Sequence, residues 1–138
     1  MRVAKFSDTE FADVVALDAF FAGLPNRNPP GLVLIPAGQI RADGLAAGEW
    51  VLFTYQARLR YLAQAASGRQ ENTFEPRQGF PHCFVVNPSS IHAIDLPVGE
   101  VERRLREAGV DRSLGGQGWT EIDSAAADRV IAELAGGA

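Results

Sequence analysis

Apolar and polar positions divide the chain into short segments of two kinds. Phe11, Leu17 and Phe21 recur near helical spacing, and Ser7 and Glu10 form an S-x-x-E motif that is typical of a helix start. Short continuous or alternating apolar runs predict strands. The predicted helices are residues 7–23, 98–108 and 123–135. The predicted strands are residues 3–5, 32–35, 49–55, 58–65, 83–86, 91–96 and 119–122.

The clearest local pattern is a β-hairpin. Two apolar-rich segments, residues 49–55 and 58–65, are separated by only two residues. Because successive side chains of a strand point to opposite faces, Val51, Phe53 and Tyr55 are expected to share one face of the sheet.

The order of these elements predicts one α+β domain over residues 1–138. Five to six mostly antiparallel strands lie between helices at both ends, three helices in all. We expect these strands to curl into a small β-barrel with a groove, because closure removes exposed strand edges. The polar segment 67–79 is a long loop, and such loops often carry function.

Composition places the chain among ordinary globular proteins. Apolar residues make up 46% and charged residues 22%, and the formal net charge is −4. The acidic excess lies in the two flanks, so nucleic-acid binding would need a local basic patch and would have modest affinity. No apolar run is long enough for a membrane helix, and one cysteine cannot form an intrachain disulfide. We therefore expect a cytoplasmic protein without membrane contact.

Motifs for catalysis or metal binding are weak. His82, Cys83 and His92 are the only imidazole and thiol groups, and their spacing does not suit zinc, so neither a metal nor a cofactor is expected. No catalytic residue is assigned, since nucleophile-elbow and phosphate-loop motifs are lacking. Cys83 and His92 lie on strands expected to be neighbours. They support an alternative function, a small-molecule-binding protein or small enzyme that uses the barrel cavity.

A second alternative is a protein-interaction module, for which the acidic C-terminal helix offers a charged surface.

The aromatic residues suggest that the barrel binds a planar ligand. Tyr55 ends its strand and Trp119 follows a glycine-rich segment, so both are predicted at the barrel mouth, where rings stack on planar ligands. The competing interpretation places both in the core, where most aromatic residues lie.

Two regions of the sequence resemble a known family. Residues 45–55, followed by residues 60–65, are similar to the G-D/E-x-V-L-F-Y … I-x-G-x-A-x-V pattern of PUA-like barrels, and within them to the EVE branch, which is related to the YTH and ASCH domains. Residues 80–86, followed by residues 95–98 and a helix, resemble the later part of such domains. The resemblance covers residues 30–125.

The resemblance implies a non-catalytic module that binds DNA or RNA and takes a base, modified or unmodified, into an aromatic pocket. Some such domains are fused to HNH nucleases in modification-dependent restriction, which implies a nuclease or restriction-type protein as a partner. We assign Tyr55 and Trp119 to the pocket walls. The residues assigned to base edges are Asn72 and Gln117, and those assigned to phosphates are Arg58, Arg60 and Arg69.

Overall fold

The computed structural model describes residues 1–37, 44–115 and 119–137, in an α+β fold. Its α-helices are α1 (Val14–Gly23), α2 (Val98–Glu107) and α3 (Ala125–Ala132). Its strands are β1 (Arg2–Phe6), β2 (Leu32–Ile35), β3 (Trp50–Tyr55), β4 (Arg58–Gln64), β5 (Gln70–Glu71), β6 (His82–Val85), β7 (His92–Pro97) and β8 (Thr120–Glu121). No helix in the described ranges is long and apolar enough to span a membrane.

The described strands form two sheets. The first has the order β7-β4-β3-β1-β8, in which β1 and β3 run parallel and the other neighbours antiparallel. The second has the order β2-β6-β5 and is antiparallel. One isolated bridge between Ala65 and Val86 joins them. The expected single closed barrel is therefore not confirmed, since β7 and β8 each have one partner strand within the described ranges.

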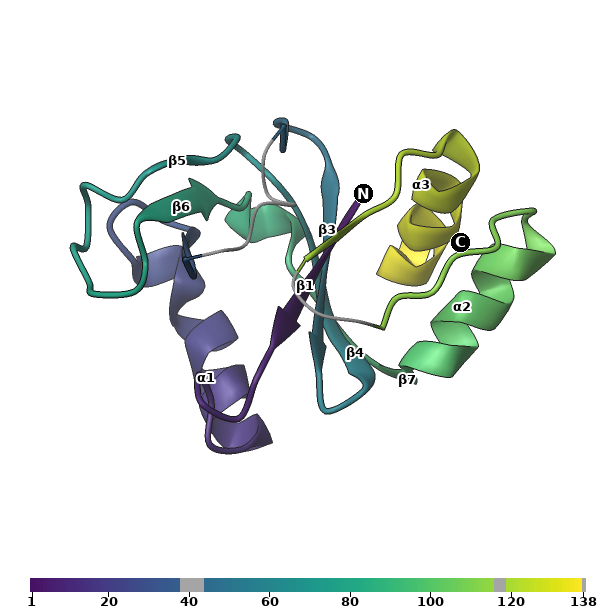
Figure 1. The fold of residues 1–138 in the computed structure, drawn as a ribbon, viewed down its shortest axis with the longest axis horizontal. Coiled ribbons are helices and arrows are strands. Elements are labelled where there is room, and N and C mark those ends of the chain that lie inside the picture. Colours follow the sequence, from purple (N-terminus) through teal and green to yellow (C-terminus); the bar gives the residue numbers. More distant parts are fainter. Residues whose placement is uncertain (38–43, 116–118, 138) are drawn as a thin grey trace.

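The larger sheet is covered on both faces (Figure 1). Helix α1 and the smaller sheet lie on one side, and α2 and α3 lie on the other. Phe53 packs with Phe21 of α1, whereas its neighbour Leu52 belongs to the cluster that contains Leu105 of α2. Val51, Phe53 and Tyr55 all join the α1-side cluster, so the predicted alternation of β3 is confirmed.

The first helix begins later than the sequence predicts. Asp13 caps α1, because its Oδ1 accepts a hydrogen bond of 2.9 Å from the backbone N–H of Ala16. The Ser7–Glu10 motif instead closes a separate turn, in which the Ser7 N–H donates to Glu10 Oε1 at 3.1 Å. The prediction of a helix from residue 7 is wrong for this reason, and residues 7–13 form a loop.

Candidate functional site

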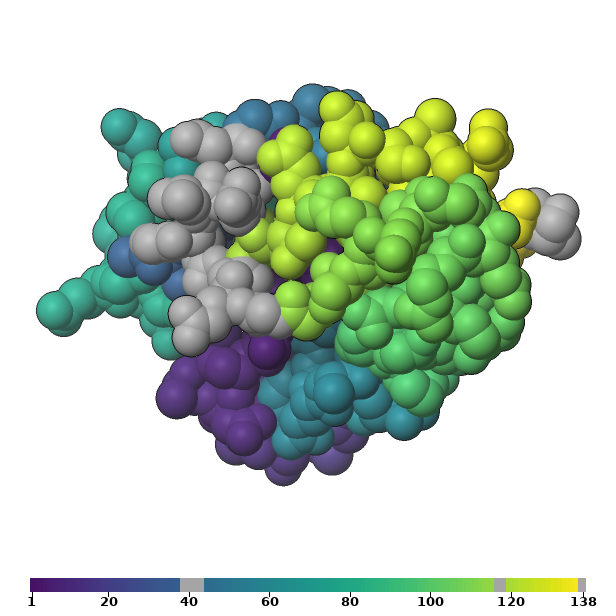
Figure 2. Space-filling view, turned by 45° about the vertical axis from the view of Figure 1, so that its right-hand side comes forward, coloured from purple at the N-terminus to yellow at the C-terminus, as the bar shows by residue number. Residues whose placement is uncertain are grey.

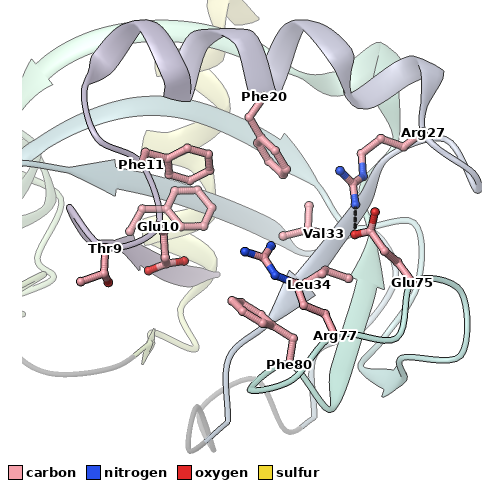
Figure 3. Close-up of a pocket in the computed structure, with 11 residues that line it drawn as sticks. Thr9, Glu10, Phe11, Phe20, Arg27, Val33, Leu34, Glu75, Arg77 and Phe80 are labelled. Atoms are coloured by element: carbon pink, nitrogen blue, oxygen red, sulfur yellow. Dashed lines mark hydrogen bonds and ion pairs between the residues drawn. The ribbon is translucent and has the colours of Figure 1, made fainter.

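An open cavity of about 330 Å³ lies between α1 and the loop of residues 72–80, beside β2 (Figure 3). It is of the size that accepts small molecules, about 300–1,000 Å³. The residues that line it come from the first 34 residues of the chain and from the 72–80 loop. The lining residues are Phe6, Thr9, Glu10, Phe11, Phe20, Arg27, Val33, Leu34, Glu75, Arg77 and Phe80.

Aromatic rings form much of the cavity wall. Phe11 and Phe20 lie on the α1 side with their ring centroids 5.3 Å apart, and buried Phe6 packs edge-on against Phe11 at 5.1 Å. Phe80 comes from the loop on the other side of the cavity (Figure 3). Phe11, Phe20 and Phe80 are half-buried, so each keeps part of its surface available to a ligand.

Two charged side chains lie within the cavity. The Arg77 guanidinium lies over the Phe80 ring, 4.8 Å from its centroid, and forms no ion pair or hydrogen bond with a described residue. Glu10 Oε1 accepts hydrogen bonds of 3.1 Å from both the backbone N–H and the hydroxyl of Ser7. Burial raises the pKa of Glu10, although the Ser7 hydrogen bonds and the charge of Arg77 act in the opposite direction.

A second pair of charges borders the cavity. Arg27 Nη2 lies 2.7 Å from Glu75 Oε2, and the Arg27 guanidinium is 5.6 Å from the centroid of the Phe20 ring. With Glu10 and Arg77, the lining contains two acidic and two basic side chains. This balance favours an uncharged ring in the cavity over an anion.

Asn72 fixes the loop that supplies Glu75, Arg77 and Phe80. Its Nδ2 donates to the Glu75 carbonyl at 2.7 Å and to the Phe80 carbonyl at 3.1 Å, and its Oδ1 accepts from the Glu75 N–H at 3.2 Å. An asparagine with all of these partners is a structural residue of the loop. Both Nδ2 hydrogens of Asn72 are in use, so Asn72 could donate to a base edge only by giving up one of these bonds, and it does not line the cavity.

The structure corrects the predicted pocket walls. Tyr55 and Trp119 are only 1% and 2% exposed and belong to the α1-side core. The Tyr55 hydroxyl donates to the Phe11 carbonyl at 2.7 Å, and Trp119 packs edge-on against Phe84 at 5.7 Å. Neither lines the cavity. The turn before α1 covers Tyr55 at the end of β3, and Trp119 is buried against Phe84 of β6.

The predicted phosphate contacts lie elsewhere on the surface. Arg58 Nε and Arg60 Nη1 lie 2.6 Å and 3.2 Å from the same Asp95 oxygen, and these two arginines hold the pKa of Asp95 below its ordinary value, chiefly through the Arg58 hydrogen bond. Arg69 is half-buried beside β5. None of the three lines the cavity. Gln117 lies outside the described residues.

The prediction that Cys83 and His92 lie on neighbouring strands is wrong. Cys83 lies on β6, which pairs with β2 and β5, whereas His92 lies on β7 and pairs with β4 in the other sheet. Burial raises the pKa of the Cys83 thiol, which disfavours the nucleophilic thiolate at neutral pH. These two residues give no support to the enzyme alternative.

The sequence pattern does not identify several of the residues that line the cavity. Phe11 is predicted to lie on an apolar helix face, and Phe20 is not singled out. The usable signal is the long polar loop, because Arg77 and Phe80 lie at its end and no regular pattern explains an aromatic and an arginine there.

Comparison with known proteins supports the fold. No protein-family model matches the chain, and no curated protein matches it in sequence. Among solved structures, it is similar to the YTH domain of the Zygosaccharomyces rouxii MRB1 protein, solved in complex with N6-methyladenosine RNA. The TM-score is 0.57 at 14% sequence identity, over 97% of this chain and 86% of that one. At this identity the similarity shows a shared fold. The resemblance to PUA-like domains, with their EVE, ASCH and YTH relatives, stays a prediction.

Proposed function

We propose that this protein is a non-catalytic nucleic-acid-binding module that takes one base of a DNA or RNA strand into the cavity between α1 and the 72–80 loop. The observation that carries the proposal is the wall of this cavity, in which Phe11, Phe20 and Phe80 surround a space of about 330 Å³. A similar fold in the YTH domain holds N6-methyladenosine RNA, which makes N6-methyladenine the first base to test.

The cavity suits the energetics of such binding. Removing a base from its stack costs a few kcal/mol. Stacking on an aromatic ring returns about 1–3 kcal/mol, and bases also stack on guanidinium planes, such as that of Arg77 over Phe80. The base is uncharged, which matches the balanced charges of the lining, while exposed Arg77 is available to the phosphate backbone.

The test is a titration of short single-stranded oligonucleotides that carry adenine or N6-methyladenine, in RNA and in DNA. Phe80→Ala is expected to weaken binding by about 5- to 150-fold, because it removes one stacking surface. Phe80→Leu keeps apolar bulk without a π face and should lose most of the same affinity. Binding that is equal for the wild type and both variants would contradict the proposal.

The charge contacts need a separate measurement. We propose that Arg58, Arg60 and Arg69 contact phosphates. The test replaces each by alanine and measures affinity from about 50 mM to about 200 mM salt. Each phosphate contact that is lost should lower the slope of log affinity against log salt concentration by about one. Arg106→Ala is the matched control, since Arg106 is an exposed arginine of α2, on the other side of the larger sheet.

A further inference from the structure

A second cavity adjoins the first. It has a volume of about 270 Å³ and is lined by Arg27, Asn28, Leu32, Phe74 and Glu75. Arg27 and Glu75 also line the aromatic cavity, so their 2.7 Å ion pair forms a wall that the two cavities share. Only this ion pair would therefore separate a ligand group in the second cavity from a base in the first.

Phe74 gives the second cavity an exposed ring. Its side chain is 49% exposed, and it makes no ring contact with another described residue. A single exposed ring is common on protein surfaces, but this one lines a cavity that shares a wall with the aromatic cavity. The 72–80 loop that carries Phe74 lies in the teal region at the left edge of the molecule in Figure 2.

The backbone on both sides of Phe74 is fixed. The Thr73 N–H donates to the Glu71 carbonyl at 3.0 Å, and Asn72 binds both the N–H and the carbonyl of Glu75. The exposed ring is thus carried by an ordered turn, which lowers the entropy cost of stacking on it. Exposed Asn28 adds an amide that can hydrogen-bond to a base edge.

We infer that the second cavity is a subsite for the nucleotide next to the base held in the aromatic cavity, with Phe74 as its stacking surface. The inference rests on the proposed function. It makes the ligand a single strand of at least two nucleotides, and it makes affinity depend on the neighbour of the recognised base as well as on that base.

The experiment compares ligands of two lengths. The probes are N6-methyladenosine, trinucleotides with central N6-methyladenine, and the same trinucleotides with an abasic position on the 5′ or 3′ side. They are titrated against the wild type, Phe74→Ala and Val15→Ala. Val15 is 71% exposed on α1 and lines neither cavity, so it serves as the exposed apolar control.

Phe74→Ala is expected to weaken trinucleotide binding by about 5- to 150-fold and to leave nucleoside binding unchanged. One abasic trinucleotide should bind the wild type as weakly as the intact trinucleotide binds Phe74→Ala. Equal trinucleotide binding by Phe74→Ala and the wild type, with no effect of either abasic position, overturns the subsite but not the aromatic cavity. If neither nucleoside nor trinucleotide binds the wild type, the proposed function fails and the subsite fails with it.

Discussion

The Arg27 guanidinium and the Glu75 carboxylate lie 2.7 Å apart, although 48 positions separate them in the sequence. Arg27 follows α1, and Glu75 belongs to the loop between β5 and β6. Their ion pair joins the two sides of the aromatic cavity. Its effect on stability is small, since the two side chains are 24% and 51% exposed and such pairs contribute about 0–1 kcal/mol. The position of the loop must depend mainly on other contacts.

Asn72 is the residue that we expect to fix this loop. Asn72→Ala removes three hydrogen bonds and should lower the free energy of unfolding by about 1–3 kcal/mol. Glu75→Gln should lower it by less than about 1 kcal/mol. Urea unfolding measures both. Asn72→Asp distinguishes the accepted bond from the donated bonds. It keeps the acceptor for the Glu75 N–H and loses the donor to the Glu75 and Phe80 carbonyls. Hydrogen exchange at the Glu75 amide should therefore accelerate more in Asn72→Ala than in Asn72→Asp.

Arg77 tests whether the cavity uses a guanidinium plane or only a positive charge. Arg77→Lys keeps the charge and loses the plane that lies over Phe80. We expect the lysine variant to bind the modified oligonucleotide several-fold more weakly with an unchanged salt slope. Arg77→Ala should lose affinity and also lower the slope by about one. Identical affinity of the wild type and Arg77→Lys would show that stacking on Arg77 contributes nothing.

Local pattern predicted the strands well. The hairpin of residues 49–65 is observed as β3 and β4, with ends that differ by one residue, because alternation and the turn are local properties. The arrangement of the strands is not local. β1 pairs in parallel with β3 across some 50 positions. The strand predicted at residues 119–122 is observed as β8, whereas β5 was not predicted, because its two residues are too few to show a periodicity.

The residues that line the cavity are not those that the sequence analysis assigns to a binding site. Sequence reasoning expected aromatic rings near a long polar loop, and the cavity has both. It placed the rings at Tyr55 and Trp119, because a strand end and a glycine-rich segment indicate exposure. Tyr55 is covered by the turn before α1, where its hydroxyl donates to the carbonyl of Phe11, 44 positions earlier in the chain. Such covering depends on tertiary packing, which residue spacing does not encode.

Substitutions in the turn between β3 and β4 are expected to raise the stability of the protein. Gln56 and Ala57 have φ values of 53° and 59°, a left-handed conformation that costs residues other than glycine about 1–2 kcal/mol. Two-residue hairpins of this kind prefer Asn-Gly. Replacing both residues by Asn-Gly should raise stability by about 1 kcal/mol and the melting temperature by about 4 °C. Ala19→Gly, at an exposed position inside α1, should instead lower stability by about 1 kcal/mol.

Glu10 should make stability depend on pH. Burial raises its pKa above the ordinary value of 4.5, so the folded state holds this proton to higher pH than the unfolded state. The stabilising contribution of the protonated form is present below pH 4.5 and is lost as the pH rises through the folded-state pKa. Glu10→Gln removes the titration, while its amide oxygen still accepts from Ser7. Relative to the wild type, the variant should therefore gain stability as the pH rises and keep that gain at neutral pH.

The measurement is urea unfolding of wild type and Glu10→Gln from about pH 4 to about pH 8, where the difference between the two cancels the titration of all other groups. Ser7→Ala is measured in the same way as a second variant. The Ser7 hydroxyl donates to Glu10 Oε1 at 3.1 Å and lowers its pKa, so its removal should move the pH window upward. A stability difference between wild type and Glu10→Gln that stays constant over this range would mean that Glu10 is solvated in the folded protein, with its carboxylate turned out of the cavity.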